Sequence, residues 1–161
     1  MSDPLLTVAI PRRIVPYTRQ PDAAKWSDRS RRYRASLQAL AVEAVAEWRK
    51  QRRTVLSPFD RPVRVGVAVW LPPVASKRSP HFGDLPGNAG DWDNFYKAAL
   101  DGLVYACVLR DDSAWHVRGP HHVAPPAEWL EGGAPFVPSG VYLSTDATPR
   151  EATVITVWGL A

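Results

Sequence analysis

The stretch GDWDNFYKAALDGLVYACVLRDDSAW, residues 90–115, places five aspartates, one lysine and one asparagine among mostly apolar residues. Ala, Leu and Lys favour helix and no proline interrupts them, so the stretch predicts a helix from Asp93 to about Val104. At 100° per residue, the polar residues of this helix fall within one stripe about 100° wide. These residues are Asp93, Asn94, Lys97 and Asp101. The other positions are apolar, which predicts a largely buried helix with one narrow charged line.

More acidic residues flank this predicted helix. Asp91 precedes it, and the pair Asp111-Asp112 follows it, directly before SAWHVR, whose alternation predicts a strand. Grouped carboxylates repel one another unless a cation holds them, and Mg²⁺ takes oxygen ligands while keeping water for substrate phosphates. Asp91, Asp93 and one member of the later pair therefore form a candidate Mg²⁺ site, which would polarise a phosphodiester and generate hydroxide.

Lys97 lies one turn after Asp93 and would stabilise the negative charge of a phosphoryl transition state. A purely structural interpretation is also open, in which Asp93 and Asp101 neutralise Lys97 at i±4 and the other acids cap the helix. That interpretation leaves Asp91 and the distant Asp111-Asp112 pair unexplained. A calcium loop is excluded, because Phe95 and Tyr96 occupy the positions where an EF-hand needs an oxygen ligand and a glycine.

The pattern D-x-D-N-x-x-K-x-x-x-D-x-L, followed about ten residues later by an Asp-Asp pair, resembles the RusA-like Holliday-junction resolvases. In this chain the pattern runs from Asp91 through Lys97 to Leu103 and resumes at Asp111-Asp112. The resemblance covers roughly residues 62–118 well, and the two ends of the chain match only in their order of elements.

The resemblance implies a small homodimeric, Mg²⁺-dependent endonuclease that nicks four-way DNA junctions symmetrically, an activity of DNA recombination and repair. It implies that Asp91, Asp93 and Asp112 hold the metal and that Lys97 is the catalytic lysine. Asp101 and Asp111 are the accessory candidates.

Length and composition describe an ordinary globular chain. With 161 residues and a net charge of +4, we expect one domain over residues 1–161 with its own core, and a charge that permits a polyanionic partner. Cys107 is the only cysteine, so no intrachain disulfide forms and a reducing interior is favoured. Without a long apolar run or a signal-peptide pattern, we expect a soluble, cytoplasmic protein with no membrane partner.

Hydrophobic periodicity and turn residues predict the remaining elements. A long helix begins near Asp28, with Ser27 or Asp28 as its cap. Its core-facing positions are Tyr33, Leu37, Leu40, Ala41, Ala44, Val45 and Trp48. The predicted strands are Leu5–Ile10, Val63–Leu71, Val141–Leu143 and Thr153–Trp158. The order strand–helix–strand–helix–strand–strand predicts an α+β fold in which two helices back a small mixed sheet.

Basic residues outside the motif are the candidate DNA contacts. Arg12 and Arg13 follow the first strand, and Lys77 and Arg78 lie in the long Pro/Gly/Ser-rich loop 72–90. Arginines also crowd both ends of the long helix, where either a solvated basic face or phosphate contact explains them. His121-His122 lies in a second irregular stretch, 119–138; no third ligand has a zinc-site spacing, so a solvated loop is the better interpretation.

An apolar helix of this kind needs partners on more than one side. We expect Trp92, Tyr96 and Leu100, or else the aromatic residues of the later strands, to be covered by a second subunit in a two-fold dimer. The alternative is a monomer in which loop 119–138 folds over that face. Two alternatives to a junction resolvase also stay open: a catalytically silent relative that binds branched or duplex DNA, and a nuclease for another nucleic-acid structure.

Overall fold

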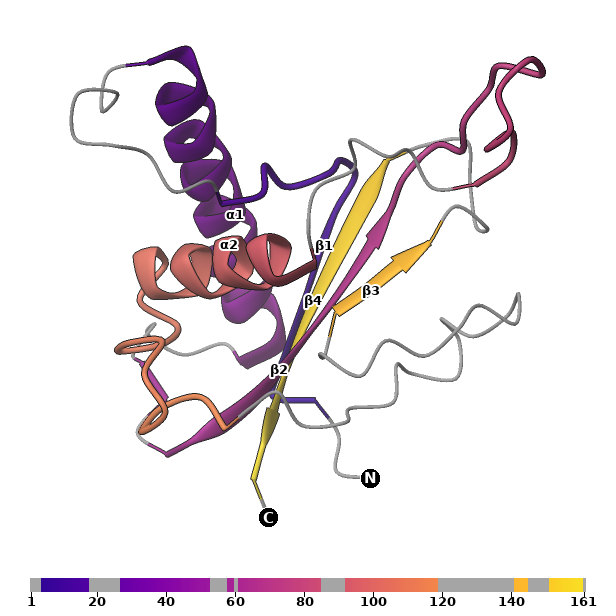
Figure 1. The fold of residues 1–161 in the computed structure, drawn as a ribbon. Helices are drawn as coiled ribbons and strands as arrows, with labels where there is room; N and C mark the ends of the chain where they lie inside the picture. The colour runs from indigo at the N-terminus through magenta and orange to yellow at the C-terminus, as the bar shows by residue number, and fades with distance from the viewer. Residues whose placement is uncertain are drawn as a thin grey trace.

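A computed structural model describes residues 4–17, 27–52, 58–59, 61–84, 92–118, 141–144 and 151–160 (Figure 1). The elements follow the predicted order, which confirms the α+β class. They are β1 (Leu6–Ile10), α1 (Asp28–Arg52), β2 (Val63–Trp70), α2 (Trp92–Tyr105), β3 (Val141–Ser144) and β4 (Ala152–Gly159). Asp91 and the stretch 119–138, with His121-His122, lie outside the described residues.

The four strands form one mixed sheet in the order β1-β4-β2-β3. β4 is antiparallel to both of its neighbours, whereas β2 and β3 are parallel. Val157 of β4 lies between Leu6 of β1 and Val65 of β2 in the register. α1 packs on β1, α2 packs on β2 and β3, and the two helices cross each other on one side of the sheet (Figure 1).

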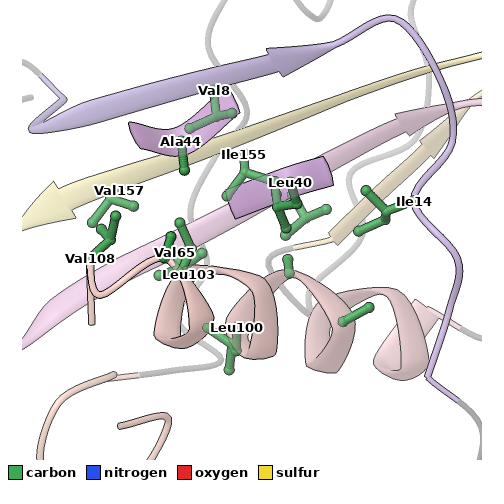
Figure 2. Close-up of a cluster of buried hydrophobic side chains, with 14 of the residues drawn as sticks. Val8, Ile14, Leu40, Ala44, Val65, Leu100, Leu103, Val108, Ile155 and Val157 are labelled. Atoms are coloured by element: carbon green, nitrogen blue, oxygen red, sulfur yellow. The ribbon is translucent and has the colours of Figure 1, made fainter. Parts of the chain in front are cut away.

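The core fills the space between this sheet and the two helices (Figure 2). Alternate residues of β1, β2 and β4 enter it, as the period of two requires. The four valines of β2 at positions 63, 65, 67 and 69 alternate along the strand and are all buried. The helices contribute residues at helical spacing. The buried helix residues include Leu40, Ala44 and Trp48 from α1, and Phe95, Ala98, Ala99 and Leu103 from α2.

Ser27 caps α1, as predicted. The amide of Ser30 donates to Ser27 Oγ at 3.2 Å, and the amide of Arg31 donates to the Ser27 carbonyl at 3.1 Å. The first bond satisfies an amide of the first turn that has no partner within the helix, and the second is the first backbone bond of the helix ladder.

Gly102 allows α2 to approach α1 closely. A Cβ at this position would lie 2.1 Å from Cδ2 of Leu40 and 2.8 Å from its Cγ. Glycine inside a helix costs about 1 kcal/mol relative to alanine. The closeness of the two helices explains why a glycine stands here in spite of that cost.

α2 ends in a Schellman motif that contains no glycine. Cys107 adopts a left-handed backbone with φ of 58°, and its amide donates to the Val104 carbonyl at 3.0 Å. The amide of Val108 donates to the Leu103 carbonyl at 2.9 Å, and both of these side chains are fully buried. The chain therefore leaves the helix sharply and is anchored again in the core at once.

The predicted strand over SAWHVR is wrong. Residues 113–116 form a turn, in which the amides of His116 and Val117 both donate to the Ser113 carbonyl at 2.9 Å. Only Val117 pairs with the sheet, in an isolated parallel bridge to Val63. Local bonding by Ser113 competes with strand pairing, as serine commonly does in turns. Its hydroxyl also lies 3.1 Å from Nδ1 of His116.

The flank that we expected a second subunit to cover is largely covered by the chain itself. Leu100 is only 6% exposed, and Tyr96 packs against the core. The expectation for Leu100 is therefore wrong, because α1 and the sheet enclose more of α2 than a single sheet face would. The Trp92 side chain lies outside what the structure describes. In the described part of the chain, neither helix is long and apolar enough to cross a membrane.

Candidate active site

Lys97 is the centre of a charged cluster on the polar stripe of α2. Its ammonium nitrogen lies 2.5 Å from Oδ1 of Asp101, one turn later on the same helix, and 2.5 Å from Oδ2 of Asp112. The predicted charged line thus becomes a lysine held between two carboxylates. The trio carries a net charge of −1, so it still favours a cation or a hydrogen-bond donor nearby.

The end of α2 brings Asp112 back to the helix that it follows. After the turn at Cys107, the side chains of Val108 and Leu109 are buried. These two anchors reverse the chain, so that Asp112 reaches Lys97 across 15 positions of sequence.

The two carboxylates keep Lys97 charged. Burial lowers the pKa of Lys97, but the hydrogen bonds and negative charges of Asp101 and Asp112 outweigh burial and raise the pKa above its ordinary value. The Lys97 side chain is 42% exposed, so its ammonium group remains accessible from solvent.

Asp111 has a different environment from its neighbour. It is exposed, and its Oδ1 accepts the amide of Asp112 at 2.8 Å. The Ser113 hydroxyl, and then this amide, hold the pKa of Asp111 below its usual range. Asp111 therefore acts as a turn residue, while Asp112 contacts the lysine.

Sequence reasoning missed Tyr33, which completes the cluster from α1. Its hydroxyl donates to Oδ2 of Asp101 at 2.5 Å, 68 positions away in the chain. Burial, followed by the hydrogen bond and charge of Asp101, raises the pKa of Tyr33 well above its ordinary value. Periodicity placed Tyr33 on the inner face of its helix. The one available signal was that an inward tyrosine needs a hydrogen-bond partner.

The described residues do not assemble the predicted set of metal ligands. Asp93 is exposed in the first turn of α2, where its Oδ1 accepts the amide of Asn94 at 3.0 Å. It lies one turn before Lys97 on the same helix, whereas Asp112 contacts the lysine from the segment that follows α2. Among the described residues, no three acidic, histidine or cysteine side chains gather as a metal site. Asp91, the remaining predicted ligand, lies outside the described residues.

The donor chemistry nevertheless fits Mg²⁺. Asp93 is exposed and Asp112 partly so, and carboxylate oxygens of this kind are the ligands of a hard cation that retains water. The purely structural interpretation also agrees in part with the contacts: Asp101 pairs with Lys97 as it required, but Asp112 rather than Asp93 is the second partner.

The predicted DNA contacts lie in two separate places. Arg12 and Arg13 belong to the segment after β1, where the Arg12 carbonyl accepts the Thr153 hydroxyl at 2.9 Å. This segment then crosses to α2, because the amide of Tyr17 donates to the Asn94 carbonyl at 2.9 Å. Lys77 and Arg78 are exposed in the loop that follows β2, and Figure 1 shows this loop extending away from α2.

Comparison of the chain with models of known protein families finds no match, and a search of curated proteins finds none either.

Proposed function

We propose that this chain is a Mg²⁺-dependent, structure-selective DNA endonuclease of the RusA-like type, which resolves four-way junctions by hydrolysing a phosphodiester in each of two strands. The observation that carries the proposal is the position of Lys97. A charged, accessible lysine lies between Asp101 and Asp112, one helical turn from the exposed Asp93. These residue types are those of the sequence motif. Asp93, Lys97 and Asp101 come from α2, and Asp112 comes from the segment that follows it.

Each residue has a role in this proposal. Asp91, Asp93 and Asp112 would hold Mg²⁺, which when bound polarises the phosphodiester and generates a hydroxide nucleophile. Lys97 has three N–H donors, of which Asp101 and Asp112 take two in the described part of the chain. The third would donate to a phosphate oxygen as negative charge develops there. Asp101 holds the ammonium group in place for that contact.

Exposed arginines beside the cluster support a polyanionic substrate. Four exposed arginines lie within about one turn of Tyr33 on α1: Arg29, Arg31, Arg32 and Arg34. Because Tyr33 contacts Asp101, this basic end of α1 adjoins the acidic site. A phosphate backbone passing over α1 would thus reach Lys97 while the arginines neutralise its charge.

A synthetic four-way junction, incubated with Mg²⁺ beside a linear duplex of matched sequence, tests the proposal. We expect symmetric nicks in the junction and little cleavage of the duplex. Lys97→Met should remove cleavage while the protein stays folded by circular dichroism. If neither substrate is cut but the junction is bound, the silent DNA-binding relative is correct. If the duplex or another structure is cut preferentially, the scaffold is a nuclease of different selectivity.

The proposal includes a two-fold dimer. Resolving a junction takes two cuts, and the Lys97 cluster of one chain would make only one of them. An apolar groove of about 520 Å³ between α1 and the end of α2 gives this proposal a surface to test. Beside it, Val42 is 68% and Tyr105 is 58% exposed, and the small side chain of Ala46 would permit another helix to approach. Light scattering at micromolar concentration should give the mass of two chains, and Val42→Glu should give the mass of one. A mass of one chain for the wild type, with both junction strands still cut in one encounter, would overturn the dimer.

A further inference from the structure

One carboxylate of the cluster is shared between a phenol and an ammonium group. Oδ2 of Asp101 accepts the Tyr33 hydroxyl at 2.5 Å, and Oδ1 accepts Lys97 at 2.5 Å. The two donors come from different helices. Because both oxygens are engaged, the Asp101 carboxylate is fixed in its plane as well as in its position.

Tyr33 is itself held from two directions. Its ring meets the ring of Tyr17 edge-on, with centroids 5.7 Å apart and planes at 71°. Tyr17 is tied to the first turn of α2 through its amide bond to the Asn94 carbonyl. The Tyr33 phenol is a proton donor at neutral pH, and burial, followed by Asp101, raises its pKa still further above the ordinary value.

Removing one support should change what Lys97 can do. If Oδ2 of Asp101 were unpaired, the carboxylate could rotate and the ammonium group could follow it or move toward Asp112. The direction of the remaining Lys97 N–H would then no longer be set. We propose that Tyr33 is a positioning residue, which fixes the Asp101 carboxylate so that the Lys97 ammonium group stays midway between Asp101 and Asp112. The catalytic consequence of this inference rests on the proposed nuclease function.

The first experiment measures turnover of the junction in Tyr33→Phe. We expect kcat to fall about tenfold, the equivalent of one charge-assisted hydrogen bond, with KM changed less than about twofold. Tyr96→Phe is the matched control, since it removes a buried phenol from α2 with no carboxylate partner among the described residues. Adding Tyr33→Phe to Asp101→Asn should cost nothing further, because the phenol acts through that carboxylate. Additive effects, or an equal loss in Tyr96→Phe, would overturn the assignment.

The second experiment does not require any cleavage. In protein labelled with ¹⁵N-lysine, NMR relaxation of the Lys97 ammonium group should show a restrained group in the wild type and in Tyr96→Phe. Tyr33→Phe and Asp101→Asn should each make it mobile, with thermal melting used to confirm that both variants are folded. Asp101→Asn keeps Tyr33 and serves as the second probe if Tyr33→Phe does not fold. A restrained Lys97 in either folded variant would overturn the proposal. If no DNA is cut by any form but Lys97 becomes mobile as expected, the positioning role holds and the nuclease function fails.

Discussion

Lys97 Nζ lies 2.5 Å from Oδ2 of Asp112, a residue 15 positions later in the chain. This contact separates the two members of the adjacent acidic pair, because Asp111 is exposed and its Oδ1 accepts the amide of Asp112. Spacing alone could not choose between them, since neighbouring residues in an extended segment face opposite ways. The carboxylate beside the proposed catalytic lysine is that of Asp112.

Asp112→Asn and Asp93→Asn should each lower Mg²⁺-dependent junction cleavage by about 100-fold or more, because each removes a charged, proposed metal ligand. Junction binding should persist or improve, since less negative charge faces the phosphates. Cleavage and gel-shift assays measure the two properties, and Asp91→Asn should behave in the same way. Asp111→Asn is the control and should keep most of the activity. If Asp111→Asn weakened metal binding more than Asp112→Asn did, the assignment within the pair would be reversed.

Binding to DNA should weaken with salt, with log K falling by about 0.9 per phosphate contact for each unit of log salt. The double variants Arg12→Ala/Arg13→Ala and Lys77→Ala/Arg78→Ala should weaken binding across sequences and flatten that slope. Nε of Arg13 lies 3.9 Å from Oε1 of Glu151, which already offsets part of its charge. The Arg12→Ala/Arg13→Ala variant should therefore weaken binding less than the Lys77→Ala/Arg78→Ala variant. Arg64→Ala, exposed on β2, is the control. Unchanged slopes in both double variants would move the DNA surface elsewhere, first to the arginines of α1.

Cys107→Gly should raise the free energy of unfolding by about 1 kcal/mol, because glycine adopts the left-handed backbone without the steric cost that a Cβ brings. Cys107→Val should lower it, since a β-branched side chain tolerates φ of 58° least. Urea unfolding measures both changes. The Cys107 side chain is exposed, so lost packing contributes little. A destabilised Cys107→Gly would contradict the account of how α2 ends.

Alkaline pH should destabilise the fold partly through Tyr96. Burial raises the pKa of Tyr96 from 10.0 to about 12. The folded chain therefore holds this proton more tightly than the unfolded chain does, so stability is full below pH 10 and declines as the pH rises toward 12. Tyr96→Phe should lose about 2 kcal/mol less than the wild type over that range. Urea unfolding at pH 9 and pH 12 compares the two proteins. Equal losses in the wild type and Tyr96→Phe would exclude burial as the cause.

Local signals predicted the elements of the fold. Ser27 caps α1 as its position suggested, and the alternating valines of β2 face the core. The polar stripe of α2 was also predictable, because a fixed helical angle brings Asp93, Lys97 and Asp101 to one side. These features depend on residues only a few positions apart, whose relative placement follows from helix or strand geometry.

Features that depend on tertiary contact were missed or wrong. The end of α2 lacks the glycine that marks most such turns, so Cys107 gave no signal. The need for glycine at position 102 depends on Leu40, which lies on the other helix. The bond from Tyr33 to Asp101 depends on how the two helices cross, which neither helix encodes alone. The strand expected at SAWHVR gave way to a turn formed by Ser113.

β4 lies between β1 and β2, although it comes last among the described strands. Leu6 pairs with Val157, so this ladder can close only after residues about 150 positions apart have both been synthesised. Such distant pairing slows folding. A ribosome that has translated only through Asp112 has made both Lys97 and its partner Asp112, but not β4, the strand that joins β1 to β2. For a protein proposed to cut DNA, this strand order means that the folded site, and with it any cleavage, has to wait until β4 has been translated.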